Sequence, residues 1–154
     1  MIIFTCTGCN SMKDVFSKEK PSNFFHTNNL ISCYIDNSPN LVGIFDVNMH
    51  KQKNLNEEES FELLKFINSL RKEFAIEKID VFDNKPVYKI FITFNKAKYV
   101  INVYDERYIS IHPWDSELSM DYLDIKDIPI SYNIYGLCKY FLKNPDYSEE
   151  INNK

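Results

Sequence analysis

Alternation between apolar and polar residues in the second half of the chain constrains the fold more than any other feature. Four runs show it: residues 88–94, 99–103, 108–112 and 118–125. A period of two is typical of a strand with one buried face, and the polar segments between the runs are short enough for tight turns. The pattern therefore predicts an antiparallel meander of three or four strands.

An earlier pair of apolar runs predicts a hairpin. Ile31–Ile35 and Leu41–Val47 are rich in β-branched and aromatic residues, and the segment between them reads Asp-Asn-Ser-Pro-Asn. These residue types favour turns. We therefore expect two paired strands ahead of the meander.

Two helices are predicted. The first begins after Asn56, which can cap it, and Glu59 is placed to return the capping hydrogen bond. Its apolar residues recur at steps of three and four and include Leu63, Phe66, Ile67, Leu70 and Phe74. This central helix should cover one face of the sheet, with Arg71 and Lys72 in its last turn. A second helix is expected at residues 133–143, before Pro145.

The predicted fold class is α+β, with a hairpin and a meander in one antiparallel sheet packed against the central helix. A chain of 154 residues suits a single domain. We place this domain at residues 30–146. Residues 1–29 read as a lipobox-like N-terminus and a flexible tether, and residues 147–154 as a polar tail.

The tripeptide Thr7-Gly8-Cys9 resembles the end of a bacterial lipoprotein signal. A lipobox has small residues before the modified cysteine, as here, although Cys6 stands where leucine is usual. The resemblance implies a lipid on Cys9 and a location in the cell envelope, on the exported side. Only Met1, Ile2, Ile3 and Phe4 precede Thr5, so either a complete signal begins upstream of Met1 or the similarity is accidental. The alternative location is the cytoplasm.

The same cysteines form a Cys6-x-x-Cys9 pair, which is the redox or zinc interpretation of this segment. A redox pair belongs at the start of a helix that follows a strand, and a zinc site needs further ligands at regular spacing. The other cysteines and histidines are scattered singly along the chain. We therefore predict no metal and no cofactor.

Composition argues against two classes of ligand. The formal charge is −4, with 22 acidic and 18 basic residues, so no excess of basic residues is available to neutralise phosphates. We expect no nucleic acid partner. The chain contains three glycines, too few for the glycine-rich loops of standard nucleotide sites.

Cys33 and Cys138 leave several chemical options open. In an oxidising compartment they could form a disulfide that closes a long loop. Cys138 also lies on the apolar side of the predicted last helix, which favours an inert core thiol. Pairing of Cys138 with His112 as a nucleophile is the less favoured alternative.

An acidic and aromatic segment is the candidate binding surface. Its predicted members are Trp114, Asp115, Glu117, Asp121, Tyr122 and Asp124. Aromatic anchors ringed by charge are typical of protein interfaces, so this surface would suit a basic protein. Other interpretations are a solvated acidic edge or a pair of hydrolase carboxylates. Trp114, the sole tryptophan, would be either a lid on the core or an exposed anchor, and burial is favoured.

The helix followed by the meander resembles small bacterial lipoproteins of unassigned function. The residues that carry the resemblance are Tyr99, Ile101, Tyr108, Ile109 and Ile111. The resemblance covers residues 57–143. The lipoproteins of this kind include immunity lipoproteins that neutralise toxins. The resemblance implies a non-catalytic, lipid-anchored binding protein whose partner is a protein, such as a basic toxin, and which meets the membrane through its lipid alone. The alternatives are a cytoplasmic interaction or structural domain and, less favoured, a hydrolase.

Overall fold

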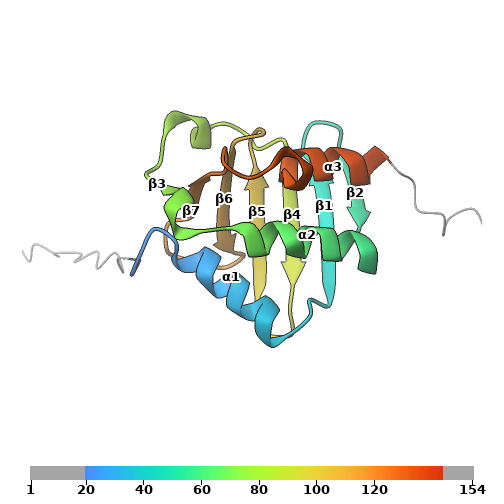
Figure 1. The fold of residues 1–154 in the computed structure, drawn as a ribbon, viewed down its shortest axis with the longest axis horizontal. Coiled ribbons are helices and arrows are strands. Elements are labelled where there is room, and N and C mark those ends of the chain that lie inside the picture. The colour runs from blue at the N-terminus through green and yellow to red at the C-terminus, as the bar shows by residue number, and fades with distance from the viewer. Residues whose placement is uncertain (1–19, 144–154) are drawn as a thin grey trace, which may run out of the picture.

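The computed structural model describes residues 20–143, and its centre is one sheet of seven antiparallel strands (Figure 1). Their spatial order is β2-β1-β4-β5-β6-β7-β3. The strands are β1 (Leu41–Asp46), β2 (Lys51–Asn54), β3 (Ala75–Ile76), β4 (Tyr88–Thr93), β5 (Lys98–Val103), β6 (Tyr108–Pro113) and β7 (Asp121–Asp124). The predicted α+β class and the four-stranded meander β4 to β7 are thus confirmed.

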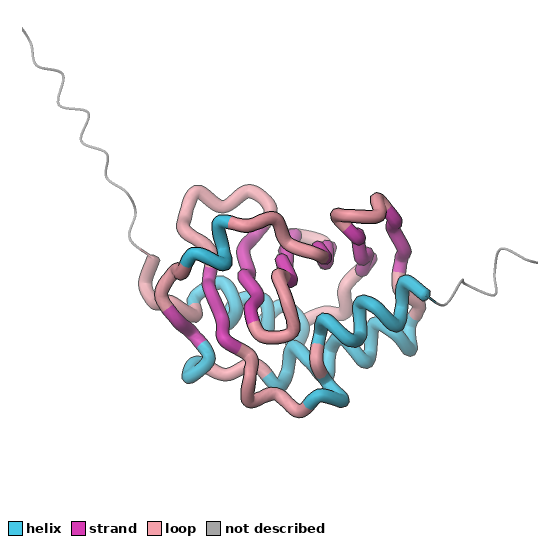
Figure 2. Tube along the Cα trace, turned by 90° about the horizontal axis from the view of Figure 1, so that it is seen from above, coloured by secondary structure: helices cyan, strands magenta, loops and turns pink. Residues whose placement is uncertain are grey.

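Three α-helices lie together on one face of the sheet (Figures 1 and 2). They are α1 (Phe25–Asp36), α2 (Glu57–Ser69) and α3 (Ile134–Lys143). α1 packs on β6 and β7, α3 packs on β1 and β2, and α2 contacts both other helices. The helical layer therefore has three members, where one central helix and a C-terminal helix were expected. None of the described helices is long and apolar enough to cross a membrane.

The segment Ile31–Ile35, predicted as a strand, belongs to α1. The helical pattern becomes visible only when residues before Ile31 are included. His26, Leu30 and Tyr34 recur every four residues and face the core. The part of the predicted tether that follows Phe25 therefore lies in a helix. The predicted pairing of Ile31–Ile35 with Leu41–Val47 is therefore wrong, and β1 instead forms a hairpin with β2, through a turn in which His50 has a φ of 53°.

α2 begins as predicted and ends earlier than predicted. Asn56 Oδ1 accepts a hydrogen bond from the Glu59 backbone at 2.9 Å, and Glu59 Oε2 accepts one from the Asn56 backbone at 3.2 Å. The helix stops at Ser69, whose hydroxyl donates to the Phe66 carbonyl instead of leaving that carbonyl to a further turn. Arg71, Lys72 and Phe74 consequently lie beyond the helix, where Lys72–Phe74 forms the 3-10 turn η1.

The two faces of the sheet are covered differently. The helix-covered face carries the core, in which Ile90, Ile101, Ile109 and Ile111 are completely buried. In the described chain no α-helix covers the opposite face, which we call the open face. One end of the open face lies under the 3-10 turn η2 (Asp80–Asp83), whose Phe82 packs against three tyrosine rings, those of Tyr104, Tyr108 and Tyr122.

Candidate functional site

The connection between β6 and β7, residues 114–120, contains the predicted anchor and is named the Trp114 loop. It lies at the edge of the sheet where β4 and β6 both end, the lower edge in Figure 1. The Trp114 backbone N–H donates to the Lys98 carbonyl at 2.9 Å, which ties the start of the loop to β5. Further along, Ser116 Oγ accepts from the Leu118 N–H at 3.0 Å. The loop thus has defined internal geometry.

Trp114 is an exposed anchor rather than a core lid. Its side chain is 63% exposed and meets the ring of Phe91, on the open face, with a centroid distance of 5.7 Å. The two rings border a shallow groove of about 180 Å³ that Thr93, Lys98 and Tyr99 also line. The expected burial of this tryptophan is wrong because residue 114 projects past the last strand pair on the face without helices.

The predicted acidic surface is divided by the alternation of β7. Asp115 and Glu117 are exposed close to Trp114, as proposed. Tyr122 instead packs on Phe82, and Asp124 accepts two hydrogen bonds from the Arg107 guanidinium at 2.6 and 2.9 Å. These bonds lower the pKa of Asp124. Because β3 pairs beyond it, β7 is not a free edge.

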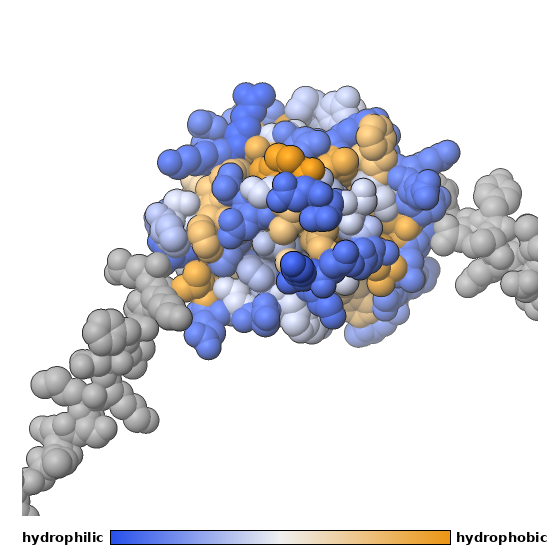
Figure 3. All heavy atoms as spheres, turned by 90° about the horizontal axis from the view of Figure 1, so that it is seen from below, coloured by the Kyte–Doolittle hydropathy of each residue, from blue (hydrophilic) through white to orange (hydrophobic). Residues whose placement is uncertain are grey.

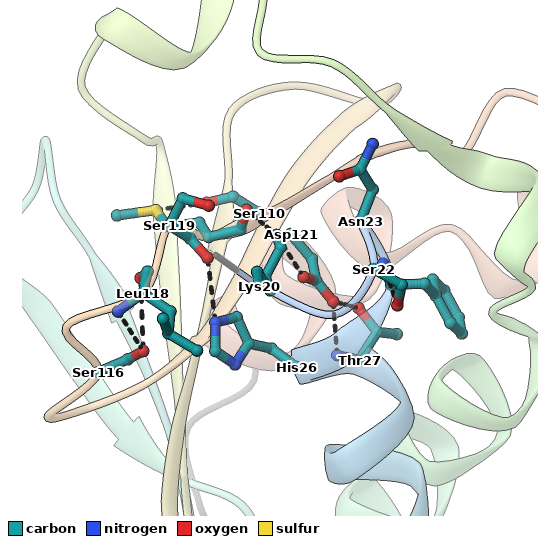
Figure 4. Close-up of polar contacts among 12 residues, drawn as sticks. Lys20, Ser22, Asn23, His26, Thr27, Ser110, Ser116, Leu118, Ser119 and Asp121 are labelled. Carbon is teal, nitrogen blue, oxygen red and sulfur yellow. Dashed lines mark hydrogen bonds and ion pairs between the residues drawn. The ribbon is translucent and has the colours of Figure 1, made fainter. Parts of the chain in front are cut away.

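Asp121 is fully buried on the helix-covered face, in a polar cluster shown in Figure 4. Its Oδ1 lies 2.8 Å from the Lys20 ammonium, and its Oδ2 accepts from the Thr27 N–H at 2.7 Å and from Thr27 Oγ1 at 2.8 Å. The Asp121 carboxylate thus caps the first turn of α1, where the N-cap residue Phe24 makes no side-chain hydrogen bond. We name Lys20, His26, Thr27 and Asp121 the Asp121 cluster.

His26 joins the Asp121 cluster to the Trp114 loop. Its ring is 1% exposed, and Nε2 lies 3.0 Å from the Ser119 carbonyl. Burial lowers the pKa of His26 and outweighs two opposing effects, the negative charge of Asp121 and the bond to Ser119. The ring is therefore neutral, and its proton is on Nε2 because a carbonyl can only accept. Sequence reasoning missed this residue by assigning it to a tether.

The disulfide that Cys33 and Cys138 could form in an oxidising compartment is not present in the structure, where both are free thiols. The cysteines belong to helices that cover opposite ends of the sheet, α1 over β6 and β7 and α3 over β1 and β2. Burial raises the pKa of the Cys138 thiol, as expected of a core cysteine. His112 lies on the open face, so it cannot activate Cys138.

A second concave surface lies between the end of α1, the start of β1 and the start of α2. It is a groove of about 450 Å³, and the exposed side chains of Leu41 and Phe61 flank it. Tyr34 lines it and has a buried hydroxyl that finds no hydrogen-bond partner in the described part of the chain. Burial raises the pKa of Tyr34, so this hydroxyl stays protonated.

Metal chemistry and broad apolar contact find little support in the described part of the chain. Across residues 20–143, no three side chains of histidine, cysteine, aspartate or glutamate are grouped so that they could hold a metal ion. Seen from below (Figure 3), the edge with the Trp114 loop shows small hydrophobic patches between hydrophilic side chains. Single anchors, rather than one wide apolar face, are what this edge offers a partner. Cys9 lies outside the described residues.

These features define a class: a compact α+β domain with a helix-covered sheet, an open face and an exposed tryptophan loop. The chain belongs to the family described as "Domain of unknown function (DUF4883)", which matches residues 20–138. It is also similar to the crystal structure named "Putative Lipoprotein from Clostridium perfringens". The two share 34% identity with a TM-score of 0.71, over 81% of this chain and 99% of that chain. No curated protein matches the chain.

Proposed function

We propose that the protein is a lipoprotein on the exported side of the cell envelope, attached through Cys9, and that its domain binds a protein partner through the Trp114 loop. Two independent observations support the anchor. The tripeptide Thr7-Gly8-Cys9 has the small residues that precede a lipidated cysteine, and the similar Clostridium perfringens protein is named "Putative Lipoprotein". Exposure of the sole tryptophan is the observation that carries the binding role.

An exposed indole on a polar loop is characteristic of a binding anchor. Tryptophan is highly buried on average, and it is enriched among the residues that dominate binding energy at protein interfaces. Around Trp114 the surface is polar, with Asp115 and Glu117 on the loop and Lys98 on the neighbouring strand. A central aromatic side chain with a polar rim is the usual anatomy of such an interface.

The narrower hypothesis is a toxin inhibitor, and the remaining acidic side chains support it in part. Asp115 and Glu117 stay beside Trp114, whereas Asp121 and Asp124 are engaged within the domain. Lys98 gives the rim mixed charge, so the partner is better defined by an apolar pocket that accepts Trp114 than by basicity. Deleting the gene should sensitise cells to a toxin of their neighbours, and a deletant that no neighbour harms would refute this role.

Lipidation is tested by replacing Cys9 with alanine. Cells fed a radioactive fatty acid should label the unmodified protein, and Cys9→Ala should abolish the label and move the protein from the membrane fraction to the soluble fraction. Cys6→Ala is the matched control and should keep the label, since it retains the modified thiol. Absence of label in the unmodified protein would favour the cytoplasmic alternative.

Binding through the loop is tested with Trp114→Ala. A photo-reactive amino acid at position 114 should identify a partner in intact cells, after which the affinity is measured with purified proteins. Trp114→Ala should weaken binding by at least about 30-fold, the effect of losing an interface hot spot worth about 2 kcal/mol. Tyr140→Ala, an exposed aromatic on α3, should leave the affinity unchanged. Equal effects of the two variants would contradict the assignment.

A further inference from the structure

The end of the Trp114 loop is held by side chains from the N-terminal part of the domain. Lys20 Nζ donates to the Met120 carbonyl at 2.7 Å, and His26 Nε2 donates to the Ser119 carbonyl at 3.0 Å. The carboxylate of the next residue, Asp121, accepts hydrogen bonds from Lys20 and Thr27. The last two residues of the loop and the first residue of β7 are thus tied to the N-terminal part of the domain, and Figure 4 shows the contacts of Ser119 and Asp121.

His26 is the member of the cluster that cannot gain a proton in place. With Nε2 donating to Ser119, Nδ1 is the bare nitrogen of the ring, and it is buried without a hydrogen-bond partner in the described chain. A proton on Nδ1 would create a buried donor with no acceptor. It would also place a positive ring in a site removed from water, which is costly.

The charged groups around His26 do not remove this cost. Asp121, from β7, attracts a charged ring, but both its oxygens already bind Lys20 and Thr27. Lys20, from the segment before α1, and His112, from β6, oppose a positive ring electrostatically. Burial is the largest effect on His26 and disfavours the charged form.

The sign of the pH dependence follows from these effects. A histidine in water has a pKa of about 6.5, and burial lowers the pKa of His26 below this value. A released ring therefore binds a proton more tightly than the buried ring does. The stabilisation from the buried neutral ring is complete above about pH 6.5 and is lost as the pH falls below it.

We propose that His26 makes the Trp114 loop sensitive to acid. Uptake of one proton expels the ring from the Asp121 cluster, breaks its hydrogen bond to Ser119 and releases the loop that presents Trp114. The consequence for partner binding rests on the function proposed above, whereas the release of the loop does not. The switch can therefore be tested without a partner and without the lipid.

The experiment uses the purified full chain between pH 7.5 and pH 5. Trp114 fluorescence reports the loop because no other tryptophan is present, and amide hydrogen exchange reports Trp114, Leu118 and Thr27, whose N–H groups donate to Lys98, Ser116 and Asp121. The protection factors of these amides should fall about tenfold per pH unit below about pH 6.5, the slope for uptake of one proton. The fluorescence should change over the same range. His26→Gln keeps a side-chain N–H for Ser119 but cannot titrate, so both signals should stay flat.

His112→Gln is the matched control and should keep the transition. The proposal is overturned if the unmodified protein shows no transition, or if the transition survives in His26→Gln. Should the glutamine variant not fold, the ring of His26 in the unmodified protein decides by nuclear magnetic resonance. Its titration must coincide with the change at Trp114, and a ring that stays neutral through that change also overturns the proposal.

Discussion

Replacing Asp121 with alanine is expected to lower the free energy of unfolding by about 3–5 kcal/mol, the cost of breaking a buried ion pair from one side. The carboxylate accepts three hydrogen bonds and is 0% exposed. Its removal leaves the Lys20 ammonium without its counter-charge and the first turn of α1 without a cap. Both losses act on the same junction between α1 and β7.

Urea denaturation followed by far-ultraviolet circular dichroism measures the effect of Asp121→Ala. Asp115→Ala removes an exposed carboxylate six residues earlier and should change stability by no more than about 0.5 kcal/mol. Adding Lys20→Met to Asp121→Ala should recover part of the loss, because it removes the uncompensated buried charge. Equal stability of the two aspartate variants would contradict the cluster seen in Figure 4.

Elements with a strong local pattern could be predicted from the sequence. β4 alternates strictly between buried and half-buried residues, and the matching period of two is visible in its amino-acid sequence alone. α2 carries its start signal in Asn56 and Glu59. In these segments the local preference and the tertiary environment agree, which is why β4 and the start of α2 lie where they were predicted.

The edges of the sheet could not be predicted in the same way. β2 reads Lys-Gln-Lys-Asn and has no apolar side chain, so its extended form depends on pairing with β1. β3 has two residues and exists because β7 offers an edge. Segments such as these obtain their structure from a neighbouring strand, and their own sequence carries little signal.

The site was predicted in part. Trp114 was singled out from the sequence as a candidate, but its exposure depends on the helices covering the other face, which no local pattern reveals. Asp121 was assigned to the surface because it belongs to an acidic segment. Its partner Lys20 is 101 residues away in the chain, so the ion pair has no local signature. The interactions at this site thus depend on tertiary contacts between segments whose own sequences carry no distinctive pattern.

Replacing Phe66 with alanine should lower the free energy of unfolding by about 3–5 kcal/mol, the range for truncating a large buried side chain to alanine. Phe66 is 0% exposed on α2, the helix that contacts both α1 and α3, so the cavity would lie where the helices meet the sheet. Phe61→Ala on the same helix is the matched control, because that ring is 56% exposed and should cost at most about 0.5 kcal/mol. Thermal unfolding separates them: Phe66→Ala should lower Tm by roughly 10 °C. Similar values for the two variants would mean that Phe66 does not belong to the core between the helices and the sheet.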